Sequence, residues 1–237
     1  MNIFRRNIPN LITCVNVLAG CVAIIFAFDP HTRFEALEGW QCAALAVAVG
    51  AVADFFDGFA ARMLKSWSEI GKELDSLSDL VSFGVAPAMI VFNLLEGIPG
   101  SPVWLPWCTL MIPVAGALRL ARFNVDTRQT TSFIGLPIPA NAIFWIGYAA
   151  IINVGSCPQW LVFPWVAVPL IACVSYLMLA PIPLFSLKFH NYGWSDNRPR
   201  WILIAGAAIL LTVFGLRSLV PIILLYLLLS AFSRRGK

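Results

Sequence analysis

Long apolar stretches recur along the whole chain, separated by short segments that contain Pro, Gly and polar residues. Within each stretch the apolar residues are continuous, as between Ile202 and Leu216, whereas a membrane β-strand alternates apolar and polar positions. A helix needs about 20 apolar residues to cross a bilayer, and the chain holds about eight such stretches. We expect membrane-spanning helices at 8–28, 36–61, 77–97, 103–121, 137–155, 160–180, 200–216 and 219–233.

The composition supports a membrane protein. Of the 237 residues, 59% are hydrophobic and only 12% are charged, about half the charged share of an average soluble domain. Such a chain cannot solvate its surface as a soluble enzyme does, and it is too hydrophobic to be disordered. The predicted fold class is therefore all-α: one polytopic membrane helix bundle over residues 1–237, without a separate soluble domain.

The distribution of basic residues predicts the orientation of the bundle. Arg5 and Arg6 precede the first apolar stretch as in a signal peptide, but the stretch is too long and no convincing cleavage site follows, so we expect a retained first helix. With these spans, 14 of the 16 Lys and Arg residues fall on one face, and only Arg33 and Arg217 on the other. Cytoplasmic loops carry such an excess. We therefore expect a multi-pass protein of the inner (cytoplasmic) membrane with both termini in the cytoplasm, and no nucleic-acid partner.

The cysteines and histidines have simpler interpretations than catalysis. The six cysteines form no CxxC pair, and all but Cys157 lie in apolar stretches, as is typical of small packing residues. His31 and His190 are isolated between predicted spans. We interpret both as loop residues.

Four carboxylates interrupt the apolar pattern near the same end of the second and third predicted spans. Asp54 and Asp57 are three residues apart, and Asp75 and Asp79 are four apart, so each pair lies on one face of its helix. Acidic groups at membrane depth are costly and usually mark a functional site. Two adjacent antiparallel helices can direct all of these carboxylates towards one another, with small residues between them.

The acidic cluster predicts a divalent metal site. Neighbouring carboxylates cannot all remain ionised without a cation, because like charges repel, and Mg²⁺ or Mn²⁺ prefers oxygen ligands. Two ions about 3.5–4 Å apart would suit bridging carboxylates and phosphoryl transfer. Gly58 and Ala61 would let a substrate approach the helix, and Arg62 offers a positive charge for a phosphate. The alternative is a set of structural ion pairs with Arg62, Lys65 and Lys72.

The acidic residues belong to a longer motif with fixed gaps, Asp54-x2-Asp57-Gly58-x2-Ala61-Arg62-x8-Gly71-x3-Asp75-x3-Asp79. This motif resembles the signature of the CDP-alcohol phosphotransferases, which are integral membrane enzymes with a core of six transmembrane helices. Enzymes of that family move a substituted phosphate from a CDP-linked donor to an alcohol and release CMP. The resemblance implies a catalytic core over about residues 8–180 and an additional transmembrane hairpin over about residues 200–233.

Carried over to this sequence, the resemblance implies a role for each residue of the motif. Asp54, Asp57, Asp75 and Asp79 would bind the metal ions, and Asp79 would also act as the general base on the acceptor hydroxyl. The CDP part of the donor would contact four further residues of the motif, namely Gly58, Ala61, Arg62 and Gly71.

Segments outside the motif indicate which branch of the family the chain resembles. They are Ile8-Pro9-Asn10-Leu11-Ile12-Thr13, Ser76-Leu77-Ser78-Asp79 with the Val81–Pro87 run, Gly116–Val125, and Phe133-x-Gly135-Leu136-Pro137-x-Pro139. Together they resemble the CDP-diacylglycerol–serine O-phosphatidyltransferases, which implies CDP-diacylglycerol and L-serine as substrates. Another acceptor, glycerol 3-phosphate or inositol, is the main alternative, and a divalent-metal transporter is less favoured.

Two arginines and three polar residues complete the candidate site. Asn10 and Thr13 could donate to the diphosphate, or else could serve the start of the first helix. Arg119 and Arg122 are three residues apart beside Asn124 and could hold the serine carboxylate or the diphosphate, because arginine suits two-pronged contacts with such groups. Membrane anchoring is the alternative for these arginines. The sequence leaves the oligomeric state open, with a homodimer as one option.

Overall fold

The structure is a computed structural model, and it describes residues 3–29, 37–66, 68–125, 133–153, 159–185 and 193–233. These residues are almost entirely helical. The helices are α1 (Ile3–Phe28), α2 (Gly39–Leu64), α3 (Glu69–Asp79), α4 (Ala86–Glu96), α5 (Met111–Val125), α6 (Ile138–Asn153), α7 (Pro164–Leu179), α8 (Trp194–Phe214) and α9 (Leu219–Ser233). A π-helix (Leu80–Val85) joins α3 to α4, and short 3₁₀ turns occupy Pro106–Leu110, Gln159–Val162 and Gly215–Ser218.

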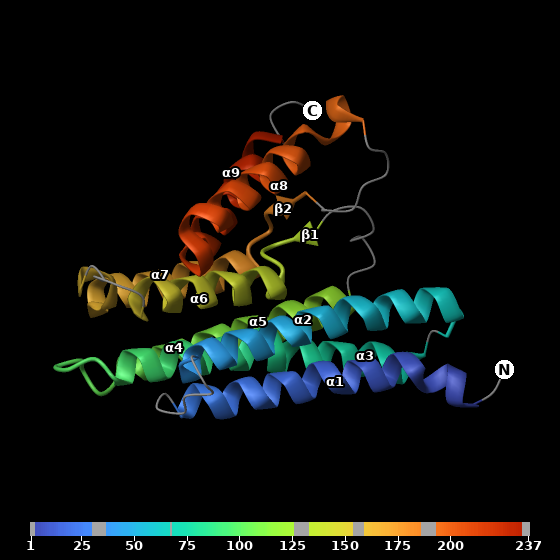
Figure 1. Cartoon of the computed structure of the whole chain (residues 1–237), viewed down its shortest axis with the longest axis horizontal. Coiled ribbons are helices and arrows are strands. Elements are labelled where there is room, and N and C mark those ends of the chain that lie inside the picture. Colours follow the sequence, from blue (N-terminus) through green and yellow to red (C-terminus); the bar gives the residue numbers. More distant parts are fainter. Residues whose placement is uncertain are drawn as a thin grey trace.

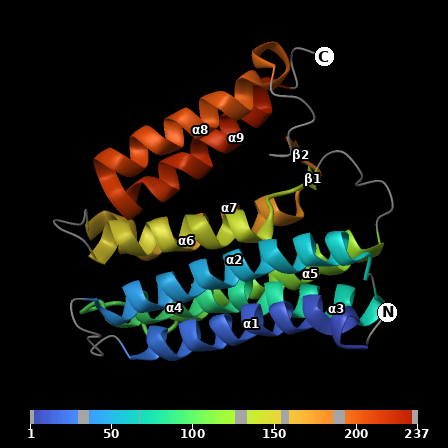
Figure 2. The ribbon, with the colours of Figure 1, turned by 45° about the vertical axis from the view of Figure 1, so that its right-hand side comes forward.

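The helices are arranged in layers (Figure 1). Helices α1 to α5 run side by side, α6 and α7 lie next to them, and the α8–α9 hairpin covers α6 and α7 on the side away from α1 (Figures 1 and 2). The interface among α1, α2 and α6 is built from small buried residues that include Ala23, Ala43 and Ala149. Small residues let membrane helices approach closely, because van der Waals packing drives their association.

The all-α membrane fold predicted from the sequence is confirmed. Five helical segments are long and apolar enough to cross a bilayer, and the last of them, Asn197–Ser233, covers both α8 and α9. Helices α6 and α7 have 16 residues each and are apolar but shorter; at 1.5 Å per residue each is about 24 Å long. Every one of the predicted spans therefore corresponds to a helix, and the crossing by α6 and α7 stays a prediction.

The third helix begins earlier than the sequence predicts, at Glu69 instead of residue 77. Ser68 caps it, because its Oγ accepts a hydrogen bond of 3.0 Å from the backbone N–H of Gly71. The first two turns are polar, so an apolar run could not reveal them. As a result, Asp75 and Asp79 lie inside a continuous helix that runs from Glu69 to Glu96.

The segment that precedes α6 forms a tight junction with the end of α7. Strand β1 (Phe133–Ile134) pairs antiparallel with β2 (Pro183–Leu184). Gly135 follows with a φ of +79°, and a side chain there would collide with the carbonyl of Met178. The Gly-Leu-Pro sequence is therefore explained by this junction between α6 and α7.

Candidate functional site

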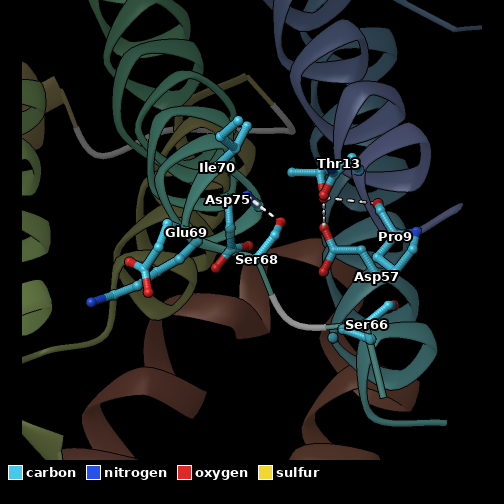
Figure 3. A pocket seen from close by; sticks show the side chains of 13 residues that line it. Pro9, Thr13, Asp57, Ser66, Ser68, Glu69, Ile70 and Asp75 are labelled. Atoms are coloured by element: carbon cyan, nitrogen blue, oxygen red, sulfur yellow. Dashed lines mark hydrogen bonds between the residues drawn. The ribbon is translucent and has the colours of Figure 1, made fainter. Parts of the chain in front are cut away.

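A cavity of about 750 Å³ opens where the start of α1, the end of α2 and the start of α3 come together, at the right-hand end of the bundle in Figure 1. Figure 3 shows Asp75 and Ser68 on one side of this cavity and Thr13 and Asp57 on the other. The cavity holds polar groups from all of these elements. Its lining consists of Pro9, Asn10, Thr13, Asp57, Gly58, Ala61, Ser66, Ser68, Glu69, Ile70, Gly71, Lys72 and Asp75.

Three of the predicted carboxylates gather beside the cavity. One oxygen atom each of Asp54, Asp57 and Asp75 lies within 4.8 Å of the others, a spacing that could hold a metal ion. No lysine or arginine in the described residues forms an ion pair with them. Arg62 instead donates from Nε to the carbonyl of Gly58 at 3.0 Å. These contacts do not support the alternative of structural ion pairs, and they leave the negative charge of the cluster uncompensated.

Helix α1 contributes directly to the acidic cluster. The Thr13 hydroxyl lies 2.6 Å from Oδ2 of Asp57 and 3.0 Å from the carbonyl of Pro9. The bond to the carboxylate is the shorter of the two, as expected for a charged acceptor. Because α1 already begins at Ile3, Thr13 and Asn10 do not serve a helix start, and that alternative is wrong. Both residues line the cavity.

The two glycines of the motif have different surroundings. A Cβ atom at Gly58 would meet no other atom within 4 Å, so this side of α2 is open to the cavity, next to Ala61. A Cβ atom at Gly71 would lie 2.8 Å from Oδ1 of Asn10 and 2.9 Å from Oγ of Ser68. A side chain at Gly71 would therefore displace the side chains of Asn10 and Ser68 where α3 meets α1, whereas Gly58 leaves room for a ligand.

Asp79 lies one turn beyond Asp75, at the point where α3 passes into the π-helix. It falls outside the group of three carboxylates but interacts with Asp54 and Asp75, so the acidic set is contiguous. Oδ1 of Asp79 accepts a hydrogen bond of 3.4 Å from Nδ2 of Asn16. Departures from regular helix geometry of this kind often accompany functional sites.

The two predicted arginines are in different environments. Arg119 is only 8% exposed, interacts electrostatically with Asp79, and has a buried Nε without a hydrogen-bond partner in the described residues. Its guanidinium lies 5.8 Å from the ring centroid of Phe123. Arg122 is exposed and donates to the carbonyl of Leu179 at 3.2 Å. Arg119 is thus buried within electrostatic range of Asp79, and Arg122 ties α5 to α7.

Asn124 has a structural connection that the sequence did not reveal. Its Nδ2 donates to Oγ of Ser76 at 2.9 Å, and its carbonyl accepts a hydrogen bond of 3.1 Å from Nζ of Lys72. These contacts link the end of α5 to α3. Neither Asn124 nor Arg62 is among the residues that line the cavity.

Sequence reasoning missed several residues of the site. Ser66 and Ser68 line the cavity between α2 and α3, and Oγ of Ser66 is buried without a partner in the part of the chain that is described. The signal for Ser68 was present, since a serine followed by Glu69 is typical of a helix start. Asn16, which contacts Asp79, gave no signal because it stands alone in an apolar stretch.

Some sequence-based predictions concern residues outside those that the structure describes. They include the loop assignments of two histidines and the positions of one cysteine and several basic residues. These residues are His31, His190, Cys157, Arg33, Arg128, Lys188, Arg234, Arg235 and Lys237.

Comparison with known proteins gives consistent results. Residues 6–175 match the family described as CDP-alcohol phosphatidyltransferase. The chain is 39% identical to a CDP-diacylglycerol–serine O-phosphatidyltransferase of Bacillus subtilis over 133 residues, 56% of this chain and 69% of that protein. Proteins with the same name from Mycobacterium leprae and Mycobacterium bovis are 33% and 30% identical, over 75% and 95% of this chain. The chain covers 57% and 75% of the length of these two.

Proposed function

Because the chain belongs to the CDP-alcohol phosphatidyltransferase family, we propose that it transfers the phosphatidyl group of CDP-diacylglycerol to L-serine. The products are phosphatidylserine and CMP. The observation that carries this proposal is the cavity of about 750 Å³ in which Asp57 and Asp75 face each other beside Gly58. The names of the curated relatives supply the donor and the acceptor.

The carboxylates have the properties of a divalent metal site. Their oxygens come within 4.8 Å of one another and no basic side chain of the described residues neutralises them, so an unoccupied cluster would be strongly self-repelling. All of the donors are hard oxygen atoms, which suit Mg²⁺ or Mn²⁺. Asp54, Asp57 and Asp75 would hold the metal, with Asp79 as a fourth ligand. When bound, two such ions would offset the charge of the diphosphate and stabilise the departing phosphate of CMP.

The CDP part of the donor occupies the cavity. Gly58 leaves space on the α2 side of the cavity, next to Ala61. Asn10 of α1 and Gly71 of α3 line its other sides. The buried hydroxyl of Ser66 supplies a further polar contact. Arg62 lies outside the lining, and in this proposal it binds a phosphate of the donor after it releases the carbonyl of Gly58.

Asp79 acts as the general base in this proposal. The serine hydroxyl gives its proton to the Asp79 carboxylate while its oxygen forms a bond to phosphorus, and the bond from phosphorus to the oxygen of CMP breaks. Asp79 lies one turn beyond Asp75 at the end of α3 and interacts with Asp54 and Asp75, which supports this role. The motif resemblance favours such direct attack over a covalent intermediate.

Arg119 is the better candidate for the serine carboxylate. It is buried, its Nε lacks a partner among the described residues, and it interacts with Asp79. A guanidinium in this position can bind a carboxylate and bring the serine hydroxyl towards the base. Arg122 and Asn124 are already engaged elsewhere, so we assign them to the support of α5.

The proposed orientation places the cavity and both termini in the cytoplasm, where CDP and serine arrive from the aqueous side and the acyl chains from the lipid. Single cysteines that replace Asn2 or Gly236, in a background without native cysteines, test this orientation. Neither should react with a membrane-impermeant thiol reagent added to intact cells. Labelling of either residue from outside contradicts the orientation.

The function is tested with purified protein in mixed micelles of detergent and CDP-diacylglycerol. CMP release should require L-serine and a divalent metal and should yield phosphatidylserine in equal amount, while Asp57→Asn should abolish both products. Glycerol 3-phosphate and inositol are offered as acceptors in parallel. Faster turnover with either one reassigns the acceptor, and failure to release CMP with any acceptor refutes the transferase function.

A further inference from the structure

We propose that Asn16 of α1 is a positioning residue that holds Asp79 in the orientation needed for proton transfer. This inference deepens the proposed function and rests on it. Asn16 belongs to neither the motif nor the cavity lining. It is nevertheless fully buried, with 0% exposure, in the first membrane-spanning helix.

The contact with Asp79 fixes how the Asn16 amide must face. Nδ2 of Asn16 lies 3.4 Å from Oδ1 of Asp79. An ionised carboxylate can only accept a hydrogen bond, so the amide must present its N–H side to Asp79. Oδ1 of Asn16 then points away, and it has no hydrogen-bond partner in the described residues.

The unpartnered oxygen lies against Gly50 of α2. A Cβ atom at Gly50 would be only 2.9 Å from Oδ1 of Asn16. A glycine here is therefore what makes room for the amide between α1 and α2. A buried acceptor without a partner is costly. This cost arises at Asn16, where the nitrogen of the same amide contacts the proposed base.

The backbone of Asn16 is held independently of its side chain. The carbonyl of Asn16 accepts a hydrogen bond of 2.8 Å from Oγ of Ser82 in the π-helix. One turn earlier, the carbonyl of Thr13 accepts from Oγ of Ser78 at 3.2 Å. Because these bonds already join α1 to α3 and the π-helix, the amide of Asn16 is not needed to attach α1, and its contact with Asp79 serves the orientation of that carboxylate.

The contacts of Thr13, which lies on the same face of α1, support this interpretation. Thr13 and Asn16 are three residues apart on α1, and they contact Asp57 on α2 and Asp79 on α3 respectively. Side chains at this spacing share one face of a helix. Helix α1 thus orients one carboxylate from each of the two acidic helices through short polar side chains.

The test compares variants in the micelle assay for serine-dependent CMP release. Asn16→Leu keeps the number and branching of the side-chain heavy atoms but removes the donor, so kcat should fall about tenfold or more, the effect of losing one hydrogen bond to a charged group. The KM for CDP-diacylglycerol should change less than about twofold, because the cavity lining is untouched. Gly50→Ala pushes on Oδ1 of Asn16 and should lower kcat in the same direction by a smaller factor.

Ser82→Ala is the matched control. It removes a buried hydrogen bond to the same residue but leaves the amide free to reach Asp79. Its Tm should fall at least as far as that of Asn16→Leu, while its kcat stays within about twofold of wild type. A kcat for Asn16→Leu that equals wild type, or an equal loss of kcat in Ser82→Ala, overturns the inference. If Asn16→Leu does not fold, Asn16→Ser, whose hydroxyl is too short to reach Asp79, takes its place with the same expectations.

A double-mutant cycle tests the contact without using activity. The Tm changes of Asn16→Leu and Asp79→Leu should not add, because each removes one partner of the same hydrogen bond. Additive changes overturn the inference. Absence of serine-dependent CMP release in the wild-type protein instead overturns the proposed function, and the cycle still decides whether Asn16 and Asp79 are coupled.

Discussion

Replacement of Gly58 by alanine adds one methyl group to α2 at a point where the protein itself leaves space. A Cβ atom at this position meets nothing within 4 Å, and Gly58 lines the cavity assigned to the CDP part of the donor. The added methyl therefore meets only a ligand. Gly58→Ala should therefore weaken binding of the donor without destabilising the fold.

The two expected effects have opposite signs. Alanine is more favourable than glycine inside a helix by about 1 kcal/mol, so the variant should unfold at a Tm a few degrees higher, at ~2–4 °C per kcal/mol for a chain of this size. Forcing one methyl group into a well-packed contact costs about 1–3 kcal/mol. If that contact is with bound CDP, the KM for CDP-diacylglycerol should rise by about fivefold to 150-fold.

Gly71→Ala provides the contrast. Its Cβ would lie 2.8 Å from Oδ1 of Asn10 and 2.9 Å from Oγ of Ser68, so the methyl group strains the packing of α3 on α1 and disturbs the helix cap. Loss of a cap alone costs about 1 kcal/mol. This variant should therefore lower the Tm as well as the activity.

Both variants are assayed by thermal unfolding in detergent and by initial rates against CDP-diacylglycerol at saturating serine and metal. The reasoning is refuted if Gly58→Ala keeps the wild-type KM for the donor, because the ligand then does not approach this face of α2. It is equally refuted if the Tm of Gly58→Ala falls, since the space beside Gly58 would then be filled by the protein.

Three further outcomes follow from the same structure. Asp57→Asn keeps the size of the side chain but removes a charged ligand, so turnover should be lost and added Mn²⁺ should rescue it only partly; full wild-type activity in metal-free buffer contradicts a metal site. Arg119→Lys should raise the KM for serine, whereas Arg122→Lys should leave it within about twofold of wild type, and the reverse result exchanges their roles. Asn141→Leu removes the buried bond of 3.2 Å to the carbonyl of Phe83 in the π-helix, which should cost about 1–3 kcal/mol, seen as a lower Tm.

The sequence predicted the helices well because their signal is local. Continuous apolar runs identify spans regardless of how the helices pack, and every predicted span corresponds to a helix. The start of α3 was missed because Glu69 to Asp75 is polar and is held by the Ser68 cap and by contact with α1. Such a segment looks like a loop until its tertiary partner is known.

The acidic cluster was also predicted from local spacing, but its neighbours were not. The intervals Asp54–Asp57 and Asp75–Asp79 put each pair on one face of its helix, and in the structure Asp54, Asp57 and Asp75 come together. Nothing in the spacing indicated that α1 packs along both helices, or that the helix changes to π geometry directly after Asp79. Both features depend on small residues of distant segments that fit together.

Helix periodicity did not predict that Arg119 and Arg122 lie in different environments. Three residues apart, they share the same side of α5 in a helical projection, yet one is 8% exposed and the other lies on the surface. The difference arises from elements far away in sequence. Helix α7 ends beside Arg122 and offers it the carbonyl of Leu179, whereas Arg119 is buried within electrostatic range of Asp79.

Tyr226 connects the C-terminal hairpin to the segment that follows α7. Tyr226 is buried, and its hydroxyl donates to the carbonyl of Phe185 at 3.0 Å, which fixes α9 against the segment that follows β2. Tyr226 lies beyond residues 6–175, the part of the chain that matches the family model. The hairpin is therefore held by a partly buried hydrogen bond to the segment after β2 and by its packing against α6.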